Sequence, residues 1–266
     1  MSRERESLLP PLKAEVTSKE GIGGSHKKEK PRTKDLMPTL SIVIPAYNEE
    51  RFIGTLLQQI RGVDLTPLGI DKQIIVVDDC SRDRTAEIAG AVPGVTVKRL
   101  AVNGGKGRAV RAGMSLATGE YLIIQDADLE YDPNDYVPML EALLAGRGDV
   151  VYGSRYLGRG RHANQSLAAY LGGRSLSLVA LLFTGRYLTD TVTALKLFHR
   201  DQLAGIELET SGFELDHEIT ARMAHRGARF VEVPIRYAPR SREEGKKIGM
   251  RDWFVAVRTF ARYRNG

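Results

Sequence analysis

The 266-residue sequence has little of what marks a secreted or membrane-spanning protein. Its single cysteine, Cys80, excludes a disulfide within the chain, so a reducing compartment is the natural expectation. The first residues, MSRERESLLPPLKAE, contain no apolar stretch of the kind that a signal peptide needs. The longest apolar run, LVALLF at 178–183, is far shorter than the roughly 20 residues of a transmembrane helix. We expect a cytoplasmic protein, either soluble or bound peripherally at the cytoplasmic face of a membrane.

Positive charge outweighs negative charge. The 39 Lys and Arg residues exceed the 33 Asp and Glu residues, which gives a formal net charge of +6. Such a balance favours anionic partners, for example phosphate groups, nucleic acid or an anionic membrane. Residues 1–38 are rich in Lys, Glu, Ser, Gly and Pro and show no hydrophobic periodicity. We predict a disordered basic tail there, either idle or in contact with a membrane surface.

Strands and helices alternate regularly after Pro38. Strands are predicted over residues 40–46, 73–79, 95–100, 120–126 and 149–154. Helices are predicted from Asn48 to about Gly62, after a cap at Ser81 or Asp83, over residues 104–118, and after Pro133. This alternation is typical of βαβ units. It predicts a single Rossmann-like α/β domain over residues 39–266, with a mainly parallel central sheet flanked by helices.

Polar residues collect where the predicted strands end. They are Pro45, Tyr47, Asn48 and Glu49 after the first strand, Asp78 and Asp79 after the second, Asp126 and Asp128 after the fourth, and Ser154 and Arg155 after the fifth. Parallel α/β sheets bind ligands at the carboxyl ends of their strands, so these residues are expected to line one crevice. Capping of the next helix explains Asp78 and Asp79 equally well.

The segment QDAD at 125–128 places two carboxylates one residue apart. At a strand end, Asp126 and Asp128 are expected to point to the same side, where they would repel each other. A hard divalent cation removes that repulsion, because it prefers oxygen ligands. Mg²⁺ usually takes one or two carboxylates and completes its shell with water and phosphates. The expected ligand is therefore a metal–diphosphate.

Six segments, in order, resemble the family 2 glycosyltransferases of GT-A fold. They are SIVIPAYNEE, IVVDDCSRDRT, QDADLEYDP, VVYGSRY, DTVTALKLF and VPIRYAPRSREEGKKIG. The last three are most similar to the branch that contains dolichol-phosphate mannose synthase and its polyprenyl-phosphate relatives. The resemblance extends from residue 40 to about residue 264. It implies an inverting transfer of a hexose from a nucleoside-diphosphate sugar to a polyprenyl (dolichyl-type) phosphate, with Mg²⁺ or Mn²⁺ as cofactor.

The resemblance also implies roles for matching residues. The expected donor site comprises Pro45, Tyr47, Glu49, Val77 and Asp79 around the nucleotide, Asp126, Ala127 and Asp128 at the ribose and metal–diphosphate, and Arg155, Arg240 and Lys246 or Lys247 at the phosphates. Asp126 and Asp128 are the expected metal ligands. Asp128, Arg155 and Arg240 are the expected catalytic residues. Lys106, in a glycine-rich segment without the G-x-G-x-x-G spacing, is a further candidate contact to the diphosphate.

The nucleophile distinguishes two acceptor classes. A phosphate monoester is already an anion near neutral pH, because its second pKa is about 6. A hydroxyl acceptor needs a general base, and Asp216 matches the position of the base in relatives that act on hydroxyls. Asp216 is thus a base, a structural residue, or a ligand to the acceptor or metal; we favour a structural or substrate-positioning role. A soluble hydroxyl or phosphorylated acceptor, and a non-catalytic nucleotide-sugar binding protein, remain the alternatives.

The C-terminal part is expected to serve the acceptor. Residues 239–249 are predicted to form a basic loop suited to closing over an anionic substrate, and an amphipathic helix is predicted to follow it, to residue 266. Residues 166–185 are the most apolar helix candidate, either in the core or at the surface near the lipid. A membrane surface is an expected partner, a membrane protein or a second copy of the chain is left open, and nucleic acid is not expected.

Overall fold

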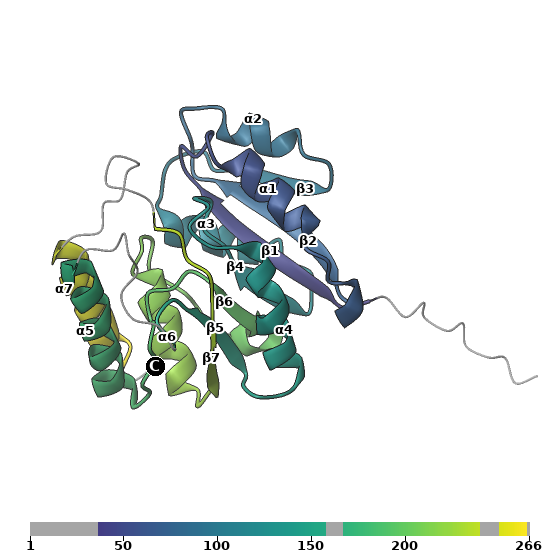
Figure 1. The fold of residues 1–266 in the computed structure, drawn as a ribbon. Helices are drawn as coiled ribbons and strands as arrows, with labels where there is room; N and C mark the ends of the chain where they lie inside the picture. The colour runs from purple at the N-terminus through teal and green to yellow at the C-terminus, as the bar shows by residue number, and fades with distance from the viewer. Residues whose placement is uncertain (1–36, 158–166, 240–249, 265–266) are drawn as a thin grey trace, which may run out of the picture. The chain divides into compact units, whose positions relative to one another are not determined.

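The computed structural model describes residues 37–157, 167–239 and 250–264. The strands in these ranges form one sheet in the order β3-β2-β1-β4-β6-β5-β7 (Figure 1). They are β1 (Thr39–Ala46), β2 (Asp71–Asp78), β3 (Val95–Arg99), β4 (Tyr121–Ile124), β5 (Val150–Ser154), β6 (Lys196–His199) and β7 (Phe230–Pro234). β6 runs antiparallel to both of its neighbours, and the other pairs are parallel. The predicted mainly parallel α/β sheet is confirmed.

Helices cover both faces of this sheet. One face packs against α1 (Ile53–Gly62), α2 (Thr85–Gly90) and α4 (Tyr136–Leu144), and the other against α3 (Lys106–Met114) and α6 (Leu215–His225). Short 3-10 helices span Thr66–Leu68, Pro133–Asp135 and Arg200–Leu203. Two further helices, α5 (Leu167–Thr184) and α7 (Met250–Arg262), pack against each other and against α6 (Figure 1). No helix in the described ranges is both long enough and apolar enough to cross a bilayer.

The segment after β1 differs from its prediction. The helix expected to begin at Asn48 begins at Ile53 instead. Asn48 has a φ of 55°, and its backbone N–H donates to Ser81 Oγ at 2.9 Å. Ser81 is therefore committed to this loop, while Asp83 Oδ1 accepts from the backbone N–H of Thr85, the first residue of α2, at 3.0 Å. These contacts hold the loops after β1 and β2 together at one edge of the sheet.

The strand order creates that edge. β1 lies between β2 and β4, so the chain reverses its direction of winding there, and the carboxyl ends of β1, β2 and β4 face a common crevice. The antiparallel strand β6 then brings its first residue to the same edge. Lys196 is paired with Ile124 at the end of β4 and with Tyr152 of β5. An ammonium group thus lies beside the strand ends that carry the predicted carboxylates.

Close packing of α3 on the sheet depends on Gly113. A Cβ at this position would overlap Val43 Cγ1 and lie 3.2 Å from Val77 Cγ2, both on buried central strands. We predict that Gly113→Ala lowers the free energy of unfolding by about 1–3 kcal/mol, because neither valine can yield without repacking the core. Chemical denaturation measures the change. The matched control is Gly62→Ala, at the exposed end of α1 with open space around it, which should be neutral or slightly stabilising. Equal stability of the two variants would contradict this packing.

Candidate active site

The loop after β4 fixes the Asp-Ala-Asp motif in a tight turn. Ala127 packs into the core, so the middle of the motif faces inward between the two carboxylate residues. Asp128 Oδ1 accepts a hydrogen bond from the backbone N–H of Glu130 at 3.2 Å, and Leu129 between them has a φ of 59°. The side chain of Asp126 is 26% exposed. The motif therefore presents its polar groups at the carboxyl edge of the sheet, as the sequence predicted.

Four alternating charges run from this motif into the protein. Lys106 Nζ lies 2.9 Å from Asp126 Oδ1 and 3.1 Å from Asp216 Oδ2. The other oxygen of Asp216, Oδ1, lies 2.8 Å from Lys196 Nζ. Lys196 is fully buried, and its ammonium also donates to the carbonyl of Thr193. We call Asp126, Lys106, Asp216 and Lys196 the charge chain. It joins the motif after β4 to the first turns of α3 and α6 and to the start of β6.

The charge chain sets the ionisation of its members. Burial acts to raise the pKa of Asp216, but Lys106 and Lys196 outweigh it and hold that pKa at about 2. Burial acts to lower the pKa of Lys106, and Asp126 with Asp216 reverses this and raises it. The pKa of Lys196 is lowered, because its complete burial exceeds the pull of Asp216. Asp216 is consequently an anion whose two oxygens each face an ammonium group, which is a poor arrangement for accepting a proton near neutral pH.

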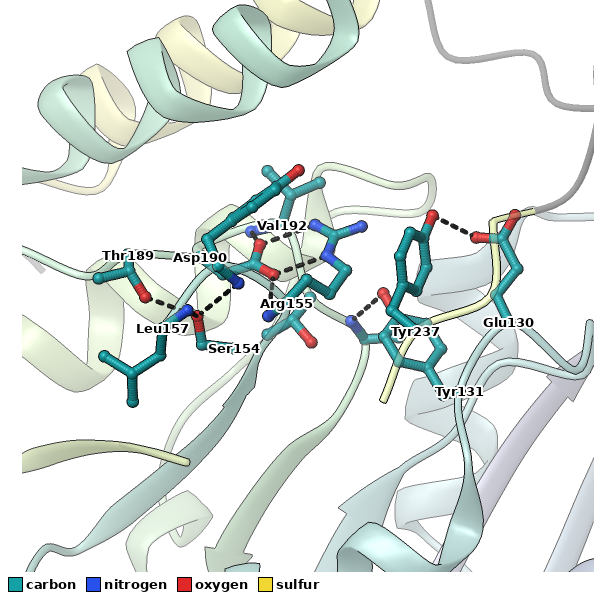
Figure 2. A network of polar contacts seen from close by, with 12 residues as sticks. Glu130, Tyr131, Ser154, Arg155, Leu157, Thr189, Asp190, Val192 and Tyr237 are labelled. Carbon is teal, nitrogen blue, oxygen red and sulfur yellow. Dashed lines mark hydrogen bonds and ion pairs between the residues drawn. The ribbon is translucent and has the colours of Figure 1, made fainter. Parts of the chain in front are cut away.

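A second buried ion pair holds Arg155, the residue that follows β5 (Figure 2). Its Nε and Nη2 lie 2.6 and 2.7 Å from the two oxygens of Asp190, and its backbone N–H donates to Asp190 Oδ2 at 3.1 Å. The rings of Tyr156 and Tyr237 lie 5.5 and 5.0 Å from the guanidinium carbon. Burial opposes the charged form of Arg155, but Asp190 outweighs it and raises the pKa of Arg155. The predicted phosphate-binding arginine is thus held in a fixed orientation.

Neighbouring side chains position this pair. Glu232 of β7 accepts from the backbone N–H groups of Thr189 and Asp190, at 2.8 and 3.0 Å, which fixes the loop that carries Asp190. On the other side, the Tyr237 hydroxyl donates to Glu130 Oε2 at 2.7 Å (Figure 2). Sequence reasoning gave no role to Asp190, Glu232, Tyr237 or Glu130. The signal for Glu130 was present, since it is a third acid two residues after Asp128.

Most of the residues that the sequence analysis assigned to the nucleotide lie on or just beyond β1 and β2. Pro45 and Val77 are opposite each other in this parallel pair, and Tyr47, just beyond β1, is 42% exposed. The Asp79 carboxylate accepts from the backbone N–H groups of Gly104 and Gly105 at 2.9 and 2.7 Å. A carboxylate has about four acceptor positions, so this geometry leaves capacity for a base N–H.

Two other predicted members of that region make local contacts. Asp78 accepts from the backbone N–H of Ser81 at 3.2 Å, so it stabilises the turn after β2 and does not cap α2, which begins at Thr85. Glu49 begins the turn that leads into α1, and its own backbone N–H donates to Thr85 Oγ1 at 2.8 Å. The Val77 side chain is fully buried in the core.

Comparison with known proteins identifies the enzyme class. The family described as glycosyl transferase family 2 matches residues 41–196. The protein is a family 2 glycosyltransferase. It is 31% identical to the undecaprenyl-phosphate mannosyltransferase of Micrococcus luteus over 217 residues, 78% of this chain and 86% of that protein. It is also 31% identical to the dolichol-phosphate mannosyltransferase of Pyrococcus furiosus over 216 residues, 79% of this chain but 59% of that longer protein.

Solved structures agree on the architecture. Glucosyl-3-phosphoglycerate synthase from Mycobacterium tuberculosis, in complex with uridine diphosphate, aligns with a TM-score of 0.63 and 23% identity over 85% of this chain and 80% of its own. Another structure of that synthase contains Mn²⁺, uridine diphosphate and phosphoglyceric acid. The likeness shows the GT-A fold for this glycosyltransferase.

Arg240, Lys246 and Lys247 lie outside the described residues. Arg174, on α5, donates to the Thr189 carbonyl at 3.0 Å, so this cation lies beside the loop that holds Arg155. His217 is a core histidine of the glycosyltransferase: burial lowers its pKa to about 4, and its ring packs on Phe260 with centroids 5.2 Å apart.

The described residues bear on the expected metal site. Within the described ranges, no three His, Cys, Asp or Glu side chains are grouped as a metal site. Two carboxylates are nevertheless a sufficient protein contribution for Mg²⁺, which takes its other ligands from water and substrate phosphates. The donor set at Asp126 and Asp128 therefore fits a metal that arrives with a diphosphate.

The charge chain yields a stability prediction. Asp216→Asn leaves Lys196 buried without its counter-charge, so we expect the free energy of unfolding at neutral pH to fall by about 3–5 kcal/mol. The exposed control Asp201→Asn should change it by less than about 0.5 kcal/mol.

The folded-state pKa of Asp216, about 2, lies below the ordinary 3.8, so its contribution to stability is present above pH 3.8 and is lost as the pH falls. The difference between wild type and Asp216→Asn should narrow from pH 4 towards pH 2; a constant difference would show that the carboxylate charge is not its cause.

Proposed function

We propose that this glycosyltransferase moves a hexose, with inversion, from a nucleoside-diphosphate sugar to a polyprenyl (dolichyl-type) phosphate. The proposal rests on the pairing of the Asp216 carboxylate with two ammonium groups. Both of its oxygens face ammonium groups and its pKa is about 2, so the acidic residue best placed by sequence to be a general base is a poor one. An acceptor that is already an anion needs no such base. The names of the M. luteus and P. furiosus relatives support the same acceptor class.

The proposed reaction is a displacement at the anomeric carbon of the sugar. An oxygen of the acceptor phosphate forms the new bond, and the bond to the nucleoside diphosphate breaks with its electron pair leaving on the diphosphate. Inversion follows from attack on the face opposite the leaving group. The protein must therefore hold two anionic groups near one another and stabilise the charge that develops on one of them.

Residues at the carboxyl edge of the sheet are suited to both tasks. Asp126 and Asp128 would hold Mg²⁺ or Mn²⁺, which when bound neutralises charge on the departing diphosphate. Lys106 lies next to Asp126 and offers an ammonium group to the same phosphates. Arg155, oriented by Asp190, and Arg174 offer positive charge between this edge and α5. In this proposal the donor binds at the carboxyl ends of β1, β2 and β4, and the acceptor binds near the end of β5 and α5.

The acceptor can be tested directly. We expect sugar transfer to a short polyprenyl phosphate and none to the matching polyprenol, which differs by the phosphate alone.

Asp128→Ala should abolish transfer while keeping a cooperative melt, because it removes a metal ligand. Asp216→Asn, assayed well below its melting temperature, should keep substantial transfer, whereas loss of a true general base costs about 10²–10⁴-fold in rate.

The opposite pattern favours the runner-up function. If the Asp216→Asn variant binds the nucleotide and metal but loses transfer, and a hydroxyl compound is the accepted substrate, the enzyme uses Asp216 as a base on a soluble hydroxyl acceptor. Full activity of a folded Asp128→Ala variant would contradict the proposed metal site. Nucleotide-sugar binding without transfer to any acceptor would indicate a non-catalytic binding protein.

We also propose that α5 and α7 rest on a membrane surface. On α5 the leucines Leu167, Leu171, Leu178 and Leu182 recur on one helical face, and all are more than half exposed. On α7, Met250 and Phe254 are 76% and 61% exposed. Arg251 and Arg258 are exposed on the same helix, so apolar and cationic groups occur together as in an interfacial helix.

This surface adjoins the proposed acceptor site. α5 and α7 lie side by side (Figure 1), joined by a hydrogen bond from Trp253 Nε1 to Ser175 Oγ at 2.8 Å. Arg174, between Leu171 and Leu178 along α5, contacts the carbonyl of Thr189, next to Asp190. A lipid phosphate could thus place its chain along the leucines and its headgroup towards Arg174. The apolar helix predicted over 166–185 is in this view a surface helix.

Vesicle binding tests the membrane contact. Leu178→Asp and Leu182→Asp should each weaken binding to vesicles that contain anionic phospholipid by at least about tenfold, since burying a leucine contributes about 1.5–3 kcal/mol. Leu144→Asp is the matched control: it is 44% exposed at the end of α4, on a helix that packs on the sheet away from α5 and α7. Co-sedimentation measures binding. Equal binding by all three variants would overturn the assignment of this surface.

A further inference from the structure

Lys106 forms an ion pair with Asp126, one of the two carboxylates that would bind the proposed metal. Its ammonium lies 2.9 Å from Asp126 Oδ1, and its side chain is 9% exposed. A second carboxylate, Asp216, holds the same ammonium at 3.1 Å. The ring of Phe213 lies 5.9 Å from it. Lys106 therefore has two anionic partners, one at the proposed metal site and one deeper in the protein.

An ammonium and a divalent cation compete for one carboxylate. Two like charges a few ångströms apart repel strongly in a partly buried site, where the effective dielectric is well below that of water. Either Lys106 leaves Asp126 when a metal ion is bound, or the metal ion binds more weakly because Lys106 stays. Departure of Lys106 from Asp126 costs little free energy, because the ammonium keeps Asp216 as its counter-charge.

The surroundings favour a short movement of this side chain. Lys106 is the first residue of α3, and the preceding residues Gly104 and Gly105 are fixed by Asp79 through two backbone hydrogen bonds. The backbone is thus anchored, so the movement takes place in the aliphatic part of the Lys106 side chain. Asp216 is fixed in turn by the buried Lys196 at 2.8 Å. A diphosphate held at Asp126 and Asp128 would offer its oxygens to the ammonium as new partners.

We propose that Lys106 is an exchangeable counter-ion: it neutralises Asp126 while the donor site is empty and passes to the diphosphate oxygens when the nucleotide binds with its metal. Asp216 is the positioning residue that retains the ammonium during the exchange. This inference rests on the proposed metal–diphosphate site at Asp126 and Asp128. As a consequence, the protein should bind a metal ion weakly in the absence of nucleotide and more tightly when the metal ion and the nucleotide bind together.

Binding of Mn²⁺ alone provides a test that does not depend on turnover. Free Mn²⁺ is measured by its electron paramagnetic resonance signal during titration of the full chain. Lys106→Met should bind Mn²⁺ without nucleotide at least about tenfold more tightly than wild type, because the competing charge is gone. The same variant should bind GDP or UDP, each tested separately with Mn²⁺, about tenfold more weakly, because a phosphate contact is lost.

Two control variants separate the local effect from net charge. Lys106→Arg keeps a cation beside Asp126 and should bind Mn²⁺ within about twofold of wild type. Lys98→Met removes the same charge from an exposed position on β3 and should also match wild type. Melting temperatures establish that each variant is folded.

The outcomes distinguish this inference from the function on which it rests. If wild type binds the Mn²⁺–nucleotide complex but Lys106→Met shows unchanged or weaker affinity for Mn²⁺ alone, the exchange is wrong and the metal site stands. A gain of Mn²⁺ affinity shared by Lys98→Met also overturns the exchange, since net charge then explains it. If neither wild type nor Lys106→Met binds Mn²⁺, with or without nucleotide, the proposed metal site and the exchange both fail.

Discussion

The candidate site depends on the charge chain of Asp126, Lys106, Asp216 and Lys196, which runs from a partly exposed carboxylate to a fully buried ammonium. Lys196 is fully buried, and a buried ammonium without a counter-charge costs several kcal/mol of lost hydration. Asp216 meets that requirement with one oxygen and uses the other to hold Lys106. The same carboxylate therefore stabilises the core and determines the charge beside Asp126. Its ionisation follows from this double role: a carboxylate between two ammonium groups is held as an anion, and it is poorly suited to take a proton from a substrate.

The antiparallel strand β6 brings the charged groups together. Because β6 lies between β4 and β5 and runs against both, its first residue, Lys196, reaches the edge where the parallel strands end. The loop that enters β6 carries Asp190, which fixes Arg155. One reversed strand and its entering loop thus supply the partner of Asp216 and the partner of Arg155. β7 supports this arrangement through Glu232, which fixes the same loop.

The described residues present two chemically different surfaces. The carboxyl ends of β1, β2 and β4 present carboxylates and backbone amides suited to a metal–diphosphate, whereas α5 and α7 present leucines and a phenylalanine to solvent. Arg174 lies on α5 and donates to the carbonyl of Thr189, so its positive charge lies beside the loop that fixes Arg155. The proposed acceptor, with an anionic head and an apolar chain, would match both features. The membership of glycosyl transferase family 2 fixes the reaction class, and this local chemistry supports the choice of acceptor.

The sequence by itself determined the alternation of strands and helices, the mainly parallel sheet, the position of the Asp126–Asp128 motif and the family, because each is written in local periodicity or in short motifs. It placed the start of the first helix too early, since the positive φ of Asn48 is stabilised by Ser81, which is 33 residues away. Tertiary structure alone decided that Lys106 meets Asp216 across 110 residues and that Asp190 holds Arg155. The physical reason is that ion pairing between distant segments depends on strand order and direction. No local pattern encodes that a single strand runs against its neighbours and carries an ammonium group to their carboxyl ends.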